Sequence, residues 1–387
     1  MATSKTVSLS RPTIGAKDLE GIRRILNSGW LTMGPETARF EEEFRRAVGS
    51  PHAVALSSGT AALHLALLAL GIGPGDEVIT TPFTFAATAN AIELTGARPV
   101  FAEIDPITWN LSPEQAARKI GKRTQAILPV HFAGRPCDLN RFRALCKKRG
   151  LFLVDDAAHA LGATAAGRRV GSAGLADATC FSFHPMKNIT TGEGGMVTCA
   201  SGEIDKTLRL LRFHGLSVDT WKRHQQKTLQ HPQVIRPGYK YGLPDLLSAL
   251  GRSQLARLKE FNARRTELAR SYHRQLSGVQ ELTLPDPGKK GMLHAWHLYV
   301  VLLSNPPHGM DRDTFVQSLR SRGIQVGVHY TCLHLHSYYR RRYGYRRGDL
   351  PVAERVGETC ITLPLYPQMK PAEVGRVCGA IRSVLAR

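Results

Sequence analysis

The sequence predicts an α/β protein in which a mostly parallel sheet forms a large domain and a smaller α+β domain follows it. The chain has 387 residues, a length that suggests two domains, and its hydrophobic content of 42% can fill a large core. From about residue 37 to residue 200, helical patterns alternate with short apolar segments. Such alternation is typical of a parallel sheet covered by helices on both faces. After about residue 246 the alternation stops.

Short apolar segments in the first part are the predicted strands. In chain order they are residues 52–56, 77–80, 126–130, 151–154, 178–183 and 195–199. Ligands of an open parallel sheet collect at the carboxyl ends of its strands. The residues directly after these segments are therefore the first candidates for a functional site.

The second part of the chain predicts the smaller domain. A Pro/Gly-rich stretch, residues 233–244, precedes it and is interpreted as the connection. Its predicted elements are a long charged helix over 246–276, a strand over 297–303, a helix over 311–323, a strand over 324–328 and a last helix over 372–385. We therefore assign the N-terminal segment and the large domain to residues 1–245, and the small domain to residues 246–387.

The chain is strongly basic, with 52 Lys+Arg against 31 Asp+Glu and a formal net charge of +21. This surplus suits an anionic partner, either nucleic acid or a phosphate-rich small substrate, or reflects only an arginine-rich composition. The one dense cluster, residues 340–347, mixes arginines with tyrosines as single-strand binders do, but no nucleic-acid module surrounds it. We interpret it as a solvated loop and expect no nucleic-acid partner.

Cysteine spacing and hydropathy bear on location and metals. The seven cysteines are an odd number without close-paired spacing, which favours reduced thiols over a disulfide framework or a zinc site. The first residues lack the apolar segment of a signal peptide, and no later apolar run without charges reaches membrane-spanning length. We expect a cytoplasmic protein with no membrane partner and no metal.

Lys187 is the most informative single residue. It follows the predicted strand 178–183 and precedes a glycine-rich turn, residues 192–195. One interpretation is a solvated lysine at a strand end. The other is a partly desolvated amine with a lowered pKa, able to form a Schiff base with a carbonyl cofactor.

Three other strand ends carry residues that such a cofactor requires. Residues 57–63 open a helix with small side chains, suited to a phosphate or simply a capped turn. Asp155 and Asp156 follow the strand 151–154, where a carboxylate could hold a protonated pyridine nitrogen or cap a helix. Phe85 could stack on a flat ring or belong to the core. Together with Lys187 they form the set that a pyridoxal phosphate enzyme needs.

The sequence resembles the DegT/DnrJ/EryC1/StrS sugar aminotransferases over nearly its full length. These are fold-type I pyridoxal phosphate enzymes. The matching motifs are residues 28–35, 57–62, 154–159, 181–188, 192–195 and 238–241. Within the family the chain is most similar to the UDP-4-amino-4-deoxy-L-arabinose aminotransferases, through residues 212–219, 238–241, 294–298 and 327–330. The related 3-dehydratases for keto sugars carry histidine where this chain has Lys187, which disfavours them.

The resemblance assigns roles to individual residues. It implies that Lys187 forms the Schiff base and moves the proton, and that Asp156 pairs with the pyridine nitrogen. Phe85 would stack on the ring, and His159 would lie near its other face or its phenolic oxygen. For the phosphate the resemblance implies Gly59, Thr60 and Ser182, although a strand hydroxyl bonded to backbone is the alternative for Ser182.

Positions nearer the substrate are less uniform in the family. Lys240 stands where many members carry an asparagine that reaches the phosphate of the neighbouring subunit's cofactor, and a lysine can also bind phosphate. His329 and Tyr330 match a segment near the sugar pocket, or have a plain strand-end role. Trp30 resembles a residue at the pocket entrance, or packs against the domain.

The activity implied by the resemblance is transfer of an amino group from L-glutamate to a nucleotide-linked 4-keto sugar, by ping-pong kinetics and in a homodimer with shared sites. Alternatives are another keto sugar, a C3 or 4-keto-6-deoxy substrate, in lipopolysaccharide, polysaccharide or antibiotic biosynthesis. A non-catalytic or nucleic-acid-binding protein is the distant alternative.

Overall fold

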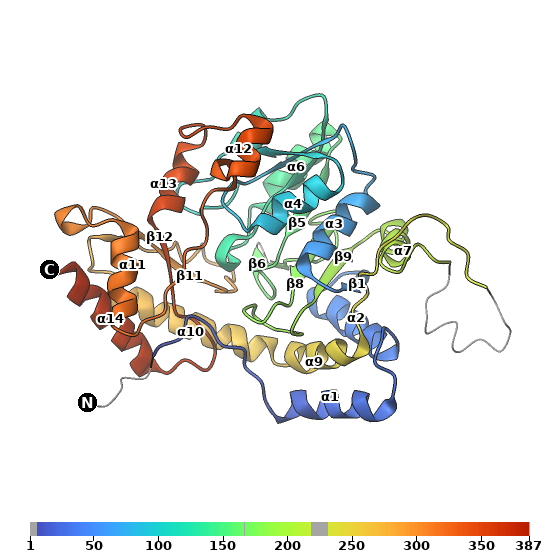
Figure 1. Ribbon diagram of the computed structural model, residues 1–387, viewed down its shortest axis with the longest axis horizontal. Helices are drawn as coiled ribbons and strands as arrows, with labels where there is room; N and C mark the ends of the chain where they lie inside the picture. The colour runs from blue at the N-terminus through green and yellow to red at the C-terminus, as the bar shows by residue number, and fades with distance from the viewer. Residues whose placement is uncertain (1–5, 166, 218–230, 387) are drawn as a thin grey trace.

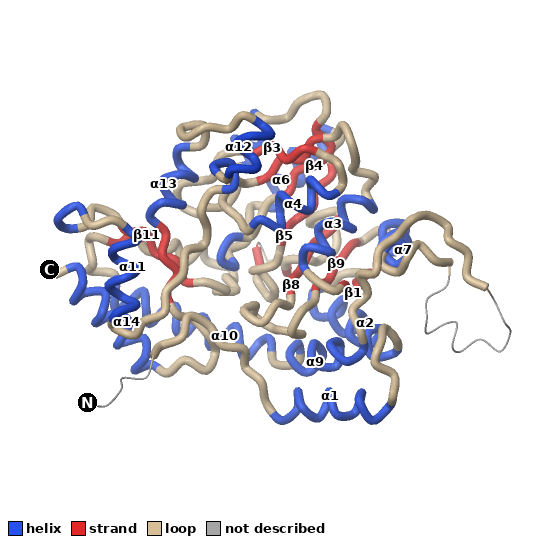
Figure 2. Tube along the Cα trace, in the orientation of Figure 1, coloured by secondary structure: helices blue, strands red, loops and turns tan. Residues whose placement is uncertain are grey.

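Within residues 6–165, 167–217 and 231–386, the part of the chain that the computed structural model describes, a seven-stranded sheet forms the centre of the larger unit (Figures 1 and 2). Its strands are β1 (His52–Leu56), β2 (Glu77–Thr80), β3 (Arg98–Phe101), β4 (Thr124–Leu128), β5 (Phe152–Asp156), β8 (Ala178–Ser182) and β9 (Gly195–Cys199). Their spatial order is β1-β9-β8-β5-β4-β2-β3. Only β9 runs in the direction opposite to the other strands of this sheet, so the predicted mostly parallel sheet is confirmed.

Helices cover both faces of this sheet, because its strands are apolar on both sides. In β1, Val54 and Leu56 pack in the core under α3, whereas Ala53 and Ala55 pack with Phe40 of α2 on the opposite face. The helices of this unit are α1 (Ala16–Ser28), α2 (Pro35–Val48), α3 (Gly59–Ala69), α4 (Ala86–Leu94), α5 (Pro113–Arg118), α6 (Leu139–Arg149), α7 (Gly202–Leu211) and α9 (Asp245–Leu255). A two-stranded ribbon of β6 (Thr164–Ala165) and β7 (Arg168–Arg169) lies beside them.

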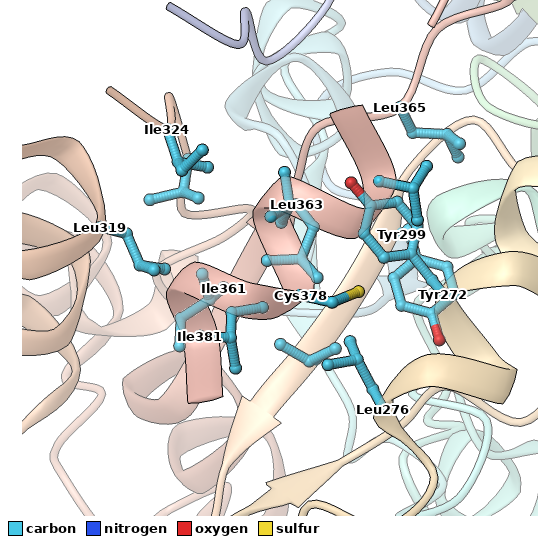
Figure 3. Close-up of a cluster of buried hydrophobic side chains, with 14 of the residues drawn as sticks. Tyr272, Leu276, Tyr299, Leu319, Ile324, Ile361, Leu363, Leu365, Cys378 and Ile381 are labelled. Atoms are coloured by element: carbon cyan, nitrogen blue, oxygen red, sulfur yellow. The ribbon is translucent and has the colours of Figure 1, made fainter. Parts of the chain in front are cut away.

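A second, antiparallel sheet lies in the C-terminal part and consists of β10 (Leu282–Thr283), β11 (Tyr299–Leu303) and β12 (Cys360–Leu363). Figure 3 shows its core, where Tyr272, Tyr299 and Cys378 come together from three different elements. The accompanying helices are α10 (Leu258–Leu276), α11 (Arg312–Ser321), α12 (Ser337–Tyr343), α13 (Pro351–Thr359) and α14 (Pro371–Leu385). The division of the chain at residues 245 and 246 stays a prediction.

The N-terminal segment joins the core of the second sheet. Val7 is buried there, and its N–H donates to the carbonyl oxygen of Gly323 at 2.9 Å, while its own carbonyl accepts the N–H of Gln325. The N–H of Leu365 donates to the carbonyl oxygen of Leu9 at 3.1 Å. Residues 7–9 thus lie on the C-terminal unit before the chain enters the larger one (Figure 1).

Three sequence-based expectations need correction. The helix predicted over 246–276 is two helices, because Arg257 leaves the helical conformation, pairs with Asp18 and lies over the ring of Phe261. Residues 324–328 make only isolated bridges, to the N-terminal segment and to β12, and form no strand. Part of the predicted loop 340–347 belongs to α12.

Two properties of the described residues concern the membrane and the thiols. None of their helices combines the length and apolar composition that crossing a bilayer requires. All seven cysteines are buried and free.

A buried carboxylate ties α2, β1 and α7 together. Glu41 accepts the backbone N–H of Ala55 at 2.9 Å, pairs with Arg209 at 2.7 Å, and also pairs with the buried Arg212. Burial raises the pKa of Glu41, but the two guanidinium groups outweigh it and hold the pKa below its usual range. The carboxylate therefore stays ionised inside the protein.

Replacing Glu41 by glutamine is expected to lower the free energy of unfolding by about 3–5 kcal/mol, since it leaves Arg212 buried without its counter-charge. The measurement is urea denaturation of the single variants. Glu42→Gln is the matched control, because Glu42 pairs with Arg45 and Arg46 at the surface of the same helix and should matter little. Equal effects of the two substitutions would contradict this account.

Candidate active site

A cavity of about 290 Å³ lies at the carboxyl ends of β1, β5 and β8. Since β1 and β8 are both antiparallel to β9, and β5 is parallel to β8, these three strands end at the same edge of the sheet. The sequence-predicted residues in the cavity wall are Gly59, Thr60, Phe85, Asp156, His159, Ser182, Lys187, His329 and Tyr330. The sheet therefore brings together residues that lie far apart in the sequence.

The N-terminus of α3 forms one end of the cavity. Ser58 caps the helix by accepting the N–H of Ala61 at 3.0 Å, so Gly59 and Thr60 present backbone N–H groups without partners inside the helix. A Cβ atom at Gly59 would lie 2.8 Å from the Cβ of Ser182 and 3.2 Å from its hydroxyl oxygen. Glycine thus allows β8 to bring a hydroxyl beside the helix N-terminus, an arrangement suited to an anion.

Asp156 ends β5 and is buried, with an exposed fraction of 5%. Its Oδ2 accepts the hydroxyl of Thr88 at 2.8 Å, and its Oδ1 accepts the N–H of Ala158 at 3.0 Å. Burial raises the pKa of this carboxyl group, while these two hydrogen bonds and the charge of Lys187 oppose the rise. A positively charged partner in the cavity would favour the carboxylate form further.

Lys187 lies half-buried in the loop that follows β8, and its side chain lines the same cavity. Loss of hydration lowers its pKa from 10.5 to about 8, although the negative charge of Asp156 opposes this shift. The solvated strand end considered as the alternative does not describe this lysine. Much of its population is therefore a neutral amine at mildly alkaline pH.

This pKa predicts how the apoprotein takes up an aldehyde. The rate at which pyridoxal phosphate attaches to Lys187 should rise with pH and level off above about pH 8, because only the neutral amine attacks a carbonyl. For a lysine with the ordinary pKa of 10.5 the rate would keep rising to that pH. The measurement is the rate at which borohydride-trapped cofactor appears on the peptide that contains Lys187. A rate that keeps rising tenfold per pH unit to pH 10.5 would contradict it.

Aromatic side chains form the rest of the wall. The rings of His159 and Tyr330 are stacked, with an interplanar angle of 17°, and the Tyr330 hydroxyl lies 3.3 Å from His159 Nε2. The ring of His297 also contacts His159, with the two ring centres 4.3 Å apart. Burial, and next the positive charge of Lys187, holds the pKa of His159 well below its usual range. Phe85 stands at the mouth with an exposed fraction of 60%, an open aromatic face.

Two predicted site residues lie elsewhere in the described chain. Lys240 places its ammonium group 4.4 Å from the centre of the Phe213 ring and does not line the cavity of its own chain. Trp30 also stays outside the cavity wall, and its indole lies against Gly34. The last two residues of the motif 212–219 fall outside the described part.

Among the cavity residues that were not predicted, Thr88 and His297 contact predicted ones. Thr88 holds Asp156, and its position three residues after Phe85, on the first turn of α4, was the available signal. His297 lies in the motif 294–298 but was assigned to a strand, which the structure starts two residues later at Tyr299. His297 Nδ1 and His159 Nδ1 are both buried without a hydrogen-bond partner among the described residues.

These features fit a flat aromatic aldehyde that carries a phosphate. The helix N-terminus and Ser182 suit the phosphate, Asp156 suits a protonated ring nitrogen, and the amine of Lys187 suits the aldehyde. The unpartnered nitrogen of His159 leaves a donor or acceptor free for a polar substituent of the ring. Pyridoxal phosphate has all of these groups.

Comparison with known proteins gives the same answer. The model of the DegT/DnrJ/EryC1/StrS aminotransferase family matches residues 12–382. The spore coat polysaccharide biosynthesis protein SpsC of Bacillus subtilis is 42% identical over 377 residues, 97% of this chain and 96% of that protein.

Solved structures are similar over almost the whole chain. Helicobacter pylori PseC, an aminotransferase involved in the biosynthesis of pseudoaminic acid, superimposes with a TM-score of 0.91 and 30% identity, covering 99% of this chain and 100% of that one. The putative sugar aminotransferase Spr1654 of Streptococcus pneumoniae, in its PLP form, has a TM-score of 0.90 and 30% identity, covering 98% and 99% of the two chains.

Proposed function

Because the chain belongs to the DegT/DnrJ/EryC1/StrS aminotransferase family and has the fold-type I architecture of pyridoxal phosphate enzymes, we propose that it transfers an amino group from L-glutamate to a nucleotide-linked 4-keto sugar. Pyridoxal phosphate is the cofactor, and when bound it supplies an aldehyde that carries the amino group and a ring that withdraws electrons. The observation that carries the proposal is the meeting of Lys187 and Asp156 in one cavity beside the N-terminus of α3.

In this proposal each side chain has a defined role. Nζ of Lys187 would hold the aldehyde of the cofactor and would accept the proton from the carbon that bears the donor's amino group. The carboxylate of Asp156 would hold the hydrogen on the ring nitrogen, and Thr88 orients that carboxylate. Phe85 would cover one face of the ring, and His159 would lie near its other face or its phenolic oxygen.

The phosphate would lie against backbone N–H groups at the start of α3. Gly59, Thr60 and Ser182 would donate hydrogen bonds to it, and the dipole of α3 favours the negative charge. We further propose that Lys240 serves the phosphate of a second copy in a homodimer. Lys240 is exposed, its ammonium group lies over the ring of Phe213, and it does not line the cavity of its own chain.

The sugar substrate would enter beside Lys187. His329 and Tyr330 line this side of the cavity, and Trp30 would stand outside it as part of the entrance. His329 Nδ1 lies 2.8 Å from the Thr362 hydroxyl, and burial followed by the charge of Lys187 lowers the pKa of His329 to about 4. A neutral imidazole there can bond sugar hydroxyl groups without repelling Lys187.

The finer identity of the substrate is proposed from likeness. A 4-keto pentose linked to uridine diphosphate is the first candidate, on the motifs shared with the UDP-4-amino-4-deoxy-L-arabinose aminotransferases. A C3 or 4-keto-6-deoxy sugar is the second candidate. Relatives named for spore coat polysaccharide and for pseudoaminic acid biosynthesis show that similar chains serve more than one pathway. Either substrate would place the enzyme in the cytoplasm and in lipopolysaccharide or other polysaccharide biosynthesis.

The deciding experiment separates the two half-reactions. L-Glutamate added to the holoenzyme should remove the visible absorption band of the lysine-bound cofactor and release 2-oxoglutarate. A panel of nucleotide-linked keto sugars should then restore the band, and the fastest one identifies the substrate. A band that L-glutamate leaves unchanged, while another amino donor removes it, would overturn the choice of donor, and a band indifferent to every donor would overturn the activity.

A further inference from the structure

A second buried carboxylate stands next to Asp156 on β5. Successive residues of a strand point to opposite faces, so Asp155 points away from the cavity that Asp156 lines. Asp155 Oδ2 lies 2.8 Å from Nε2 of His131, and both side chains are completely buried. The other carboxylate oxygen of Asp155 has no hydrogen-bond partner among the described residues. His131 is therefore the one hydrogen-bond partner of the Asp155 side chain among the described residues.

The ring of His131 is fixed from its other side as well. Its Nδ1 lies 2.9 Å from the backbone N–H of Cys137 and accepts that hydrogen. Nε2 must then carry the ring hydrogen and donate it to Asp155. The thiol of Cys137 in turn donates to the carbonyl oxygen of Val130, at 3.1 Å. This closes a short loop of hydrogen bonds directly behind the cavity, because Val130 lines the cavity wall.

The backbone of the same segment is bonded to Asp156 itself. The N–H of His131 donates to the carbonyl oxygen of Asp156 at 3.1 Å, and the N–H of Asp156 donates to the carbonyl oxygen of Pro129 at 2.9 Å. Both peptide groups of Asp156 are therefore held by residues 129–131. The side chain of His131 adds a third attachment, through Asp155, to the same strand end.

We propose that His131 is a positioning residue for Asp156. It does not touch the cofactor cavity, but it holds the end of β5 so that the Asp156 carboxylate stays where the pyridine nitrogen binds. The inference rests on the proposed function, in which Asp156 is the partner of that nitrogen. The substrate-binding side of the cavity plays no part in it.

Physical reasons make this attachment necessary. Apart from Thr88 and the N–H of Ala158, the structure gives the Asp156 carboxylate no hydrogen-bond donor among the described residues, so its position depends on the backbone that carries it. Without His131, Asp155 would be a buried carboxylate with no partner, one residue away from Asp156. Such a group recruits water or moves, and either change displaces the strand end. A shift of about 1 Å at a catalytic position can cost about 100-fold in rate.

The chain offers a matched control for the loss of a buried imidazole–carboxylate pair. His334 is also completely buried, and its Nε2 lies 2.9 Å from Oε1 of Glu354. Neither of these residues lines the cavity. Replacing His334 by leucine therefore removes the same kind of bond at a place where Asp156 should not respond.

The experiment compares His131→Leu, His131→Gln and His334→Leu as purified proteins. It measures the melting temperature of each apoprotein, the dissociation constant of pyridoxal phosphate by equilibrium dialysis, and the pH midpoint of the visible band. Both leucine variants should melt at lower temperature. Only His131→Leu should also bind the cofactor about tenfold more weakly and shift the pH midpoint, since outer partners of a ligand typically matter by about 10–100-fold. His131→Gln, whose amide can still donate to Asp155, should recover most of the affinity.

Each result has a defined meaning. If His131→Leu does not fold, His131→Asn replaces it, since its shorter amide can accept from Cys137 but cannot reach Asp155. If the wild type responds to L-glutamate while the two leucine variants lose cofactor affinity equally, the positioning role is overturned and the proposed function stands. If the wild type itself binds no pyridoxal phosphate, the proposed function is overturned and this inference with it.

Discussion

Replacing Lys187 by alanine is expected to reduce amino transfer by about 10²–10⁴-fold, the usual contribution of a positioned proton carrier. The reason is geometric, because Lys187 is the one lysine or arginine among the described residues of the cavity wall. The variant should still bind pyridoxal phosphate through α3 and Asp156, but without a covalent bond. The measurements are the rate of 2-oxoglutarate formation and the release of cofactor on denaturation after borohydride treatment.

Lys187→Arg separates the effect of the positive charge from the effect of the reactive amine. A guanidinium group keeps the positive charge near Asp156 but stays protonated at any working pH, so it can neither attack an aldehyde nor accept a proton. This variant should be as inactive as Lys187→Ala, and it should bind the cofactor at least as tightly as Lys187→Ala does. Activity of either variant within tenfold of the wild type would mean that Lys187 is not the reacting amine.

The second large effect is expected at Asp156. Asparagine has the same shape, and its amide oxygen can accept the N–H of Ala158 while its amide nitrogen can donate to the Thr88 hydroxyl, but it carries no charge to hold a hydrogen on the ring nitrogen. A charge-assisted hydrogen bond contributes about 1.5–3 kcal/mol, so Asp156→Asn should slow the L-glutamate half-reaction by at least about 10–100-fold. Single-turnover absorbance measurements would give this rate directly.

Thr88→Val calibrates the effect of Asp156→Asn. It removes one hydrogen bond to the carboxylate and leaves the charge, so its half-reaction should lie between those of Asp156→Asn and the wild type. The order of the three rates is the test. A Thr88→Val variant slower than Asp156→Asn would show that the threonine acts on something other than the carboxylate.

The sheet and most of the cavity could be predicted from the sequence, for one physical reason. Lys187, Asp156 and Gly59 each follow closely on an apolar strand, and a parallel sheet brings the carboxyl ends of its strands to one edge. Residues near the ends of different strands in the sequence are therefore expected to lie close together in the fold. The strands themselves were evident because both faces of this sheet are covered and most of the strand residues are apolar.

Features that depend on tertiary contacts could not be predicted in this way. The break at Arg257 follows from its contacts with Asp18 and Phe261, which come from a distant helix and from the next turn. The pairing of His131 with Asp155 joins two residues in an apolar context that shows no periodicity of its own. The direction of the Lys240 side chain depends on Phe213, which only the folded chain brings beside it.

The attachment of the N-terminal segment to the second sheet has a consequence for the order of folding. Val7 completes a core whose other members come from residue 268 onward, and its backbone partners are Gly323 and Gln325. During synthesis Val7 emerges long before these partners exist. This core can therefore close only after residues 268–385 have been synthesised, and contacts of such high sequence separation form slowly. Val7 is therefore among the last residues of this core to find all of its neighbours.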